Sequence, residues 1–300
     1  MATTIYNQID SNKKRTFLVM ILFSLFFISV FYIFAKALGE GLTFLGFGLI
    51  FVGIMNFLSY YNSDKIVLAV SGAKQITKKE NPPLFRIVEN LSIAAGITVP
   101  RIYLITDTAP NAFATGRDPK HASIALTRGL LEKLEKLELE GVIAHELSHI
   151  RNFDTRLMAV VSILVGIVAL ISDWFLRITW WGGGRGNREN NQGTALFFFI
   201  ALIAAILAPI IGLLIQLAIS RRREFLADAS GVLLTRYPDG LANALLKIAK
   251  DKEPLEVANR ATAHLYIANP LKDQSALSWF AKAFSTHPSL EERVVALRAM

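Results

Sequence analysis

The sequence predicts a mainly α-helical α+β fold, in a polytopic membrane protein whose folded part carries a small β-sheet. The mean hydropathy is +0.41, and 53% of the 300 residues are hydrophobic, which exceeds the share found in ordinary soluble domains. Four long apolar runs are candidate membrane spans, and the polar stretches around them combine helical and strand-like patterns.

The first two apolar runs predict an N-terminal transmembrane hairpin, residues 1–61. Residues 17–35 are long enough to span a bilayer, and they follow a basic cluster at 13–15 that favours the cytoplasmic side. A cleaved signal peptide is the alternative, because residues 35–37 (Ala-Lys-Ala) resemble a cleavage site. We expect an uncleaved anchor, since this run exceeds a signal core of roughly 7–15 residues and a second run follows at 42–61.

Residues 62–156 are expected to form the first part of a soluble unit. Gly96 is the expected C-terminal cap of its first helix. The expected helices are 84–95, 129–136 and 137–152, and the expected strands are 101–106, 122–127 and a short strand or turn at 111–116.

Residues 157–219 are expected to form a second transmembrane hairpin. Its apolar runs, 157–176 and 194–219, are joined by an external loop at 177–193, and a basic cluster at 221–223 marks the return to the cytoplasmic side. Residues 220–300 then complete the soluble unit. Helices are expected at 224–234, 241–251 and 289–299, and 258–284 receives no assignment.

A His-Glu-x-x-His motif lies within the helix expected at 137–152. Residues four apart share a helix face, so His145 and His149 can present two imidazoles to one metal ion, with Glu146 beside them as a base. Two histidines, an open coordination position and a carboxylate are typical of zinc proteases. A buried helix with two ordinary histidines is the alternative, and the helical context favours the metal site.

The expected third ligand is Glu224. One class of such sites places a third histidine six residues after the second, but that position is Thr155. Another class uses a glutamate on a later helix, where Glu224 and Asp228 share one face, and Asp228 is expected to orient a ligand histidine. Because two membrane crossings separate His149 from Glu224, both lie on one side. We therefore predict a site at the cytoplasmic membrane interface.

Composition limits the other possible functions. The chain contains no cysteine, which excludes disulfides, cysteine-ligated zinc and thiol catalysis. The net charge of +8 is better explained by basic residues beside membrane spans than by nucleic-acid binding, so no nucleic-acid partner is expected.

Together these features resemble the HtpX-type membrane zinc metalloproteases, which are relatives of the CAAX prenyl endopeptidases. The resemblance implies a zincin-like metalloprotease domain in the cytoplasm, one zinc ion per chain, and a multi-pass position in a bacterial inner membrane. It also implies cleavage of misfolded or damaged membrane proteins in a stress response. The matching segments are 111–116 (NAFATG), 142–150 with Asp154, 224–228 (EFLAD), and 287–289 (HPS) with Glu292 and Arg293.

The resemblance also assigns roles to individual residues. His145, His149 and Glu224 match the metal ligands and Glu146 matches the base, while Asp154 is expected to support the ligands or to cap a helix. His287 and Arg293 match a pair thought to stabilise the oxyanion. Asn111, Ala112 and Phe113 lie where related enzymes hold substrate as an added strand. We expect an extended substrate to pair with the edge of the strand at 122–127.

Three other functions fit parts of the sequence. A CAAX prenyl endopeptidase would share the metal chemistry, but such relatives have more membrane spans than the two hairpins expected here. A non-enzymatic membrane scaffold could retain the zinc fold, but the intact Glu146, Glu224 and His287 argue against lost catalysis. A transporter would need more charged residues inside its apolar runs.

Overall fold

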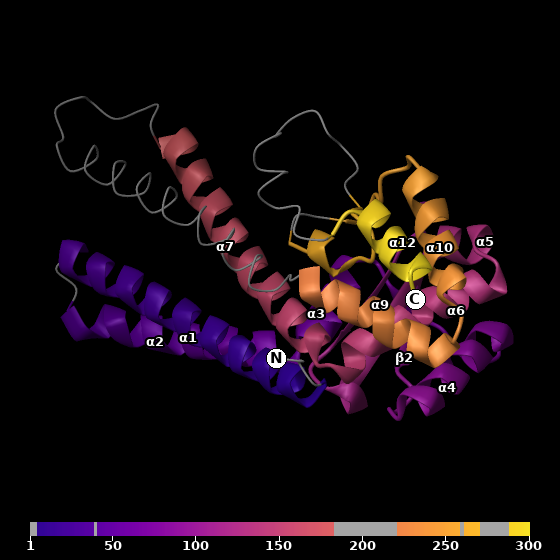
Figure 1. Ribbon diagram of the computed structural model, residues 1–300. Coiled ribbons are helices and arrows are strands. Elements are labelled where there is room, and N and C mark those ends of the chain that lie inside the picture. The colour runs from indigo at the N-terminus through magenta and orange to yellow at the C-terminus, as the bar shows by residue number, and fades with distance from the viewer. Residues whose placement is uncertain (1–4, 39–40, 183–220, 259–260, 271–287) are drawn as a thin grey trace.

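The computed structural model describes residues 5–38, 41–182, 221–258, 261–270 and 288–300. Three long helices, α1 (Ile5–Leu38), α2 (Gly41–Tyr61) and α7 (Asp154–Gly182), extend to one side of a block of shorter helices and a small sheet (Figure 1). The membrane span expected at 194–219 and the residue His287 lie outside the described residues.

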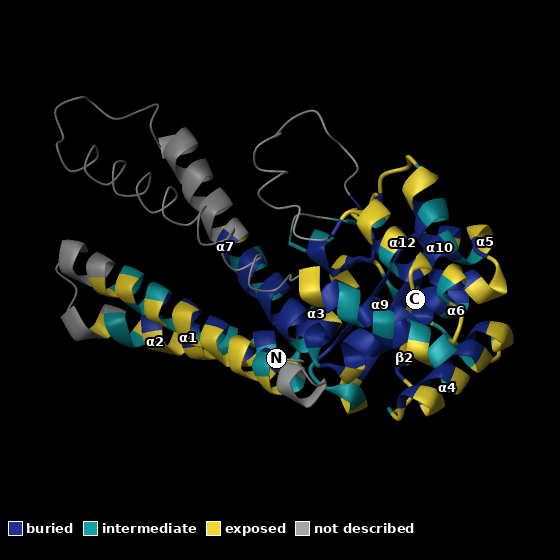
Figure 2. Ribbon diagram, in the orientation of Figure 1, coloured by how far each residue is buried: buried dark blue, intermediate teal, exposed yellow. Residues whose placement is uncertain are grey.

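The helices α1 and α2 pack against each other as a helical hairpin, over the residues expected to form the first transmembrane hairpin. The helix α1 begins before the apolar run, so the basic cluster at 13–15 is itself helical. Among the described residues, Ile9–Tyr32 of α1 is long and apolar enough to cross a membrane. Leu45–Tyr61 passes the same test jointly with the following helix α3 (Ser63–Val70), from which it is bent by 76°. The hairpin exposes large apolar side chains along its length (Figure 2), which suits a lipid environment.

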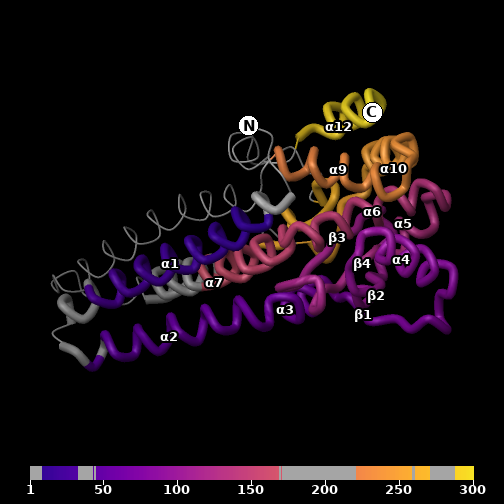
Figure 3. Tube along the Cα trace, turned by 60° about the horizontal axis from the view of Figure 1, so that its bottom comes forward, coloured from indigo at the N-terminus to yellow at the C-terminus, as the bar shows by residue number. Residues whose placement is uncertain are grey.

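The hairpin packs against α7, and the tube drawing shows α1 running alongside this helix (Figure 3). The contact is an apolar seam of residues that are 0–4% exposed. Its members from the hairpin are Val19, Phe23, Phe27 and Val52, and those from α7 are Leu157, Val160, Val161, Leu164, Val165 and Val168. The seam brings the polar start of α1 to the start of α7, next to the globular block.

The sheet has four strands in the order β1-β2-β4-β3. The strands are β1 (Lys74–Gln75), β2 (Arg101–Ile105), β3 (Ala112–Gly116) and β4 (Ala122–Thr127). The strand β4 pairs in parallel with β2 and antiparallel with β3. The expectation that 122–127 is an edge was therefore wrong. A short connection returns the chain antiparallel beside β3, and β2 occupies the other side of β4. Among the described residues, β1 and β3 are therefore the two edge strands.

Two helices cover the sheet and introduce the site. The helix α4 (Pro82–Ala95) is capped by the Asn81 side chain and ends at Gly96, whose φ of 68° confirms the expected left-handed cap. The helix α6 (Lys136–Arg151) carries the His-Glu-x-x-His motif and begins with a capping box between Glu135 and Glu138. A short helix, α5 (Arg128–Lys133), connects β4 to α6.

Residues before and after the second predicted hairpin share one hydrophobic core. The later helices of the block are α9 (Arg221–Thr235), α10 (Pro238–Lys250) and α12 (Leu290–Arg298). Val142 and Leu147 of α6 belong to the same buried cluster as Leu241 of α10 and Leu297 of α12. This core holds the early motif helix against helices that follow it by about a hundred residues, and so it positions the site.

Candidate metal centre

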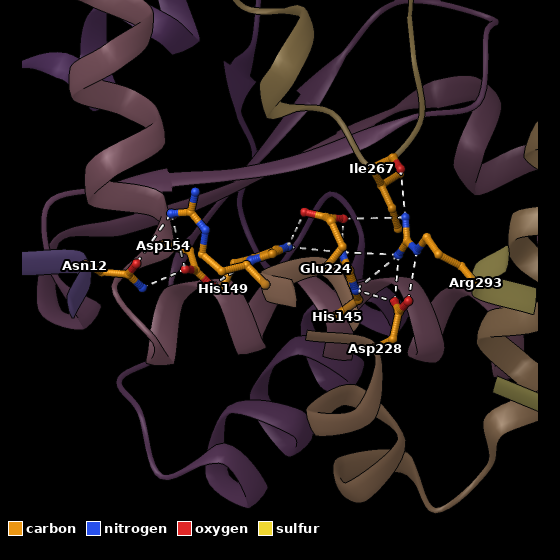
Figure 4. A network of polar contacts seen from close by, with 9 residues as sticks. Asn12, His145, His149, Asp154, Glu224, Asp228, Ile267 and Arg293 are labelled. Carbon is orange, nitrogen blue, oxygen red and sulfur yellow. Dashed lines mark hydrogen bonds and ion pairs between the residues drawn. The ribbon is translucent and has the colours of Figure 1, made fainter. Parts of the chain in front are cut away.

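The helix α6 crosses the interior of the block. The side chains of His145, Glu146 and His149 are 1%, 2% and 5% exposed. Buried polar groups of this kind need partners, because an unpaired polar group loses its hydration without compensation. The close-up view shows where those partners come from: α9, α12 and the start of α7 (Figure 4).

Three predicted ligand side chains converge. The Nε2 atoms of His145 and His149 lie 3.1 Å apart. A Glu224 carboxylate oxygen lies 3.7 Å from Nε2 of His145, and the other lies 3.6 Å from Nε2 of His149. One atom from each residue falls within 4.8 Å of the others, so the three can hold a metal ion.

The close approach of α9 to α6 depends on Gly231. A Cβ added there would lie only 3.1 Å from the backbone nitrogen of His145, closer than nearly all real Cβ contacts. Glycine lets the two helix backbones approach each other at the level of the ligand. Two turns earlier on α9, Glu224 is thereby brought over the imidazoles. Sequence reasoning did not identify Gly231, because its signal is a contact between helices.

Each ligand histidine has a carboxylate on its other nitrogen. Nδ1 of His145 lies 2.9 Å from Oδ1 of Asp228, and Nδ1 of His149 lies 3.0 Å from Oδ2 of Asp154. Both carboxylates are 1% exposed. Such contacts fix the ring orientation and direct Nε2 toward the shared centre. The structure thus places both predicted supporting residues beside the ligands.

The surroundings shift the pKa values of the two histidines in opposite directions. Burial, reinforced by the Arg293 charge, lowers the pKa of His145 to about 4 despite the Asp228 contact. Burial also opposes the charge on His149, but the Asp154 hydrogen bond and the Glu224 charge outweigh it and raise its pKa to about 9. His145 is therefore already in the neutral form that binds metal, whereas His149 must release a proton.

Arg293 comes from α12 and is fully buried. Its Nε and Nη2 donate to the two Asp228 oxygens at 2.9 Å and 2.6 Å. Its Nη1 donates to the carbonyl of Ile267 at 3.1 Å and lies 3.6 Å from Glu224. A forked pair of this kind is strong and directional. The guanidinium thus holds the carboxylate that orients His145 and lies beside the third ligand (Figure 4).

Glu146 lies between the metal ligands and the edge strand β3. Burial raises its pKa to about 7, with a smaller contribution from the Glu224 charge, while His149 and the backbone N–H of Ala114 oppose the rise. The Ala114 contribution places the carboxylate beside the middle of β3. A carboxyl group with a pKa near neutrality can both accept and return a proton.

The predicted substrate-binding residues lie at the start of β3 and contact another part of the chain. The Asn111 side chain donates to the carbonyl of Ala268 at 3.0 Å, and the Ala112 carbonyl accepts from the N–H of Ile267 at 3.0 Å. The Phe113 ring packs edge-on against Tyr266, with centroids 5.0 Å apart. The segment 266–268 thus runs beside the first residues of β3, and Ala114 is the β3 residue next to Glu146.

Sequence reasoning missed two other buried residues near the ligands. Asn12 and Arg223 are 2% and 5% exposed, and both contact the Asp154 side chain. Neither belongs to a recognisable motif. Asn12 precedes the apolar run at 17–35, and Arg223 belongs to the basic cluster at 221–223, so neither carried a local signal for the site.

The residues present fit a zinc ion. Zinc prefers four-coordinate sites with imidazole and carboxylate donors at roughly 2.0–2.2 Å, which places ligand atoms roughly 3.3–3.6 Å from one another. The spacings of 3.1 Å, 3.6 Å and 3.7 Å are close to that arrangement. Two histidines and one glutamate leave a fourth position for the reaction.

Sequence comparisons connect this geometry with known proteins. The family model described as Peptidase family M48 matches residues 78–300. A protease HtpX homolog of Dictyoglomus thermophilum is 44% identical over 299 residues, covering 99% of this chain and 95% of the relative. A homolog from Tropheryma whipplei is 45% identical over 310 residues, covering 98% of each chain. The HtpX resemblance is thereby confirmed.

A solved structure supports the fold. The crystal structure of S. mikatae Ste24p aligns with a TM-score of 0.51 at 20% identity, covering 94% of this chain and 66% of that protein. At this identity the likeness concerns the fold alone, whereas the family model and the relatives cover most of the sequence. The chain therefore belongs to peptidase family M48 and is a membrane-bound metalloendopeptidase.

Proposed function

We propose that this protein is a zinc-dependent endopeptidase that cleaves unfolded segments of membrane proteins at the cytoplasmic face of a bacterial inner membrane. The observation that carries the proposal is the convergence of His145, His149 and Glu224 within 4.8 Å, with Glu146 buried beside them. This set of three donors and one adjacent carboxylate suits hydrolysis of an amide bond.

Glu146 carries the proton in the proposed reaction. Bound zinc would supply Lewis-acid polarisation of a water molecule and of the scissile carbonyl. Glu146 accepts a proton from that water as it attacks, and then donates the proton to the leaving amine nitrogen, so the peptide bond is exchanged for a carboxylate and an amine. Its pKa of about 7 suits both steps.

The edge strand β3 is the proposed substrate platform. Along β3, the backbone N–H and C=O groups of successive residues point alternately toward β4 and away from it. Those of Ala112, Ala114 and Gly116 are directed away from β4. The Ala112 carbonyl accepts a hydrogen bond from the N–H of Ile267, and the Gly116 carbonyl accepts one from the Thr155 hydroxyl. Ala114 lies beside Glu146, which accepts from its N–H, so we expect the Ala114 carbonyl to accept a main-chain hydrogen bond from an extended substrate. Such pairing favours unfolded segments over folded proteins.

The predicted topology supports the location. The basic cluster at 13–15 favours the cytoplasmic side for the start of α1, and this end of α1 contacts the site. The active centre would then lie where α1 and α7 leave the bilayer, which suits substrates that are themselves membrane proteins. The proposed role is removal of misfolded membrane proteins during stress.

The test is Glu146→Gln, which keeps the size of the side chain and removes the base. Purified protein in detergent is assayed for zinc content and for cleavage of an unfolded protein and an unfolded membrane protein. Cleavage is expected to fall by at least about a hundredfold while one zinc ion remains bound. Undiminished cleavage would exclude Glu146 as the base. Loss of zinc would show that Glu146 is also needed for metal binding.

A further inference from the structure

The cytoplasmic end of α1 reaches into the metal centre through one side chain. Asn12 is 2% exposed, although its neighbours Lys13 and Lys14 are exposed. It lies ahead of the apolar run at 17–35 in the sequence, yet Figure 4 shows it directed at Asp154, the carboxylate that contacts His149. The contact joins positions that are 142 residues apart in the chain.

Both the nitrogen and the oxygen of the Asn12 side-chain amide make hydrogen bonds. Nδ2 donates to Oδ1 of Asp154 at 2.7 Å and to the carbonyl of Asn152 at 2.9 Å. Oδ1 accepts from Nη1 of Arg223 at 3.4 Å, and Arg223 also lies 3.8 Å from Asp154. A side-chain amide has separate donor and acceptor groups, so it can donate to a carboxylate and accept from a guanidinium at the same time.

These partners support two of the three ligands. Asp154 contacts Nδ1 of His149 with its other oxygen, at 3.0 Å. Arg223 immediately precedes Glu224 in the first turn of α9. A displacement of Asn12 would therefore act on His149 through Asp154 and on Glu224 through Arg223.

Asn12 also stabilises an unusual turn. The chain passes from α6 to α7 through Phe153, whose φ of 59° is uncommon for an aromatic residue. Such a conformation persists only where the surroundings fix it. Asn12 bonds to the residues on both sides of this turn, Asn152 and Asp154. The turn determines how Asp154 faces His149.

We propose that Asn12 is a positioning residue of the metal centre, which couples the N-terminal hairpin to the ligands His149 and Glu224. The inference rests on the proposed metal site. It extends that site to α1, whose Asn12 would help to orient the metal ligands. Movement of α1 relative to α7, for example when a substrate enters beside the hairpin, would change the ligand geometry and the affinity for the metal ion.

The experiment compares Asn12→Ala with a matched control, Asn56→Ala, in full-length protein. Asn56 also contacts α1 in a partly buried position, donating to Ser24 at 2.8 Å, but it lies within the hairpin and away from the metal centre. Zinc release is timed with a chelator, and the visible spectrum of the cobalt-substituted protein reports ligand geometry. Asn12→Ala is expected to release zinc about tenfold faster and to change the cobalt spectrum, whereas Asn56→Ala matches the wild type.

A second variant separates positioning from folding. Asn12→Asp has nearly the same size and keeps an acceptor for Arg223, but it loses the donor to Asp154. It is expected to accelerate zinc release as Asn12→Ala does. Combining Asn12→Ala with Asp154→Ala is expected to have less effect than the sum of the two single changes, because both remove the route through Asp154, and only the route through Arg223 remains for Asn12→Ala to weaken.

The outcomes distinguish the two proposals. Wild-type zinc release and an unchanged cobalt spectrum in both Asn12 variants would overturn the positioning role, and so would fully additive effects with Asp154→Ala. Zinc that remains bound at wild-type affinity in a His149→Ala variant would instead overturn the metal site itself.

Discussion

At the scale of single residues, the site is a set of charges that hold one another in place. Asp228 contacts His145 and is paired with Arg293, while Asp154 contacts His149. Burial would raise the pKa of Asp228, but the Arg293 charge keeps it below its usual value. Both carboxylates can therefore orient a neutral imidazole toward a metal ion.

This arrangement predicts proton release when metal binds. The pKa of His149 is raised to about 9 in the metal-free protein, so at roughly neutral pH this imidazole carries a proton that zinc must displace. Zinc affinity should rise as the pH increases toward about 9 and level off above it. Calorimetric titration with zinc in two buffers of different ionisation enthalpy measures the protons released.

The Asp154→Asn variant is the matched comparison, because it removes a charge that raises the pKa of His149. It should release fewer protons per zinc near neutral pH. Equal proton release by the wild type and this variant would mean that Asp154 does not control the protonation of His149.

At the scale of elements, two helices determine the geometry of the centre. The helix α6 presents both histidines, and α9 crosses close enough to add Glu224 because Gly231 has no side chain. The edge strand β3 lies on the other side of Glu146. The site is thus built from a helix pair and one strand of the four-stranded sheet.

Replacing Gly231 with alanine tests the helix contact. The added Cβ would lie 3.1 Å from the His145 nitrogen, so α9 would have to move by a few tenths of an ångström. Such overpacking costs about 1–3 kcal/mol, and zinc affinity should fall with the displacement of Glu224. Thermal unfolding and chelator competition measure the two effects.

Gly53→Ala in α2 is the control, because a Cβ there meets nothing within 4 Å. Its stability should equal or slightly exceed that of the wild type, since alanine favours helix over glycine. Equal behaviour of the two alanine variants would contradict a role for close packing at Gly231.

The sequence allowed the helices and the ligand set to be predicted, because both depend on local patterns. Spacing within α6 placed His145 and His149 on one face, and the pairing of Glu224 with Asp228 followed the same rule. The sheet order did not follow from any local pattern, which is why 122–127 was wrongly taken as an edge. The helix α3 and the strand β1 were also missed, since both are short.

The contacts of Asn12 and Arg223 could not be predicted for a related reason. Each depends on how α1, α7 and α9 come together, and neither residue type indicates metal chemistry by itself. The turn at Phe153 was equally hidden, because the sequence shows only a gap between a helix and an apolar run. These features appear once the packing of distant segments is known.

At the scale of the whole molecule, the long helices are connected to the catalytic block by packing and by hydrogen bonds. The helix α1 packs along α7 through an apolar seam, and the polar end of α1 contacts the site. The exposed apolar surface of the hairpin suits lipid (Figure 2). In the proposed topology, this arrangement would hold the active centre directly against the bilayer.

The predicted topology can be tested by cysteine labelling, since the natural chain contains no cysteine. Single cysteines are introduced at Lys14 and Glu253, which are exposed on the side expected to face the cytoplasm, and at Asn187 in the expected external loop. In inner-membrane vesicles of known orientation, the first two positions should react only from the cytoplasmic side and the third only from the opposite side. Labelling of all three from one side would contradict two transmembrane hairpins.

The most direct measurement is the zinc content of the purified Glu224→Ala variant beside the wild type and Glu291→Ala. Glu291 is exposed in the first turn of α12 and serves as the matched control. If His145, His149 and Glu224 share one metal ion, the wild type and the control hold about one zinc per chain, and Glu224→Ala loses most of it. A full complement of zinc in Glu224→Ala would show that the third ligand is another residue.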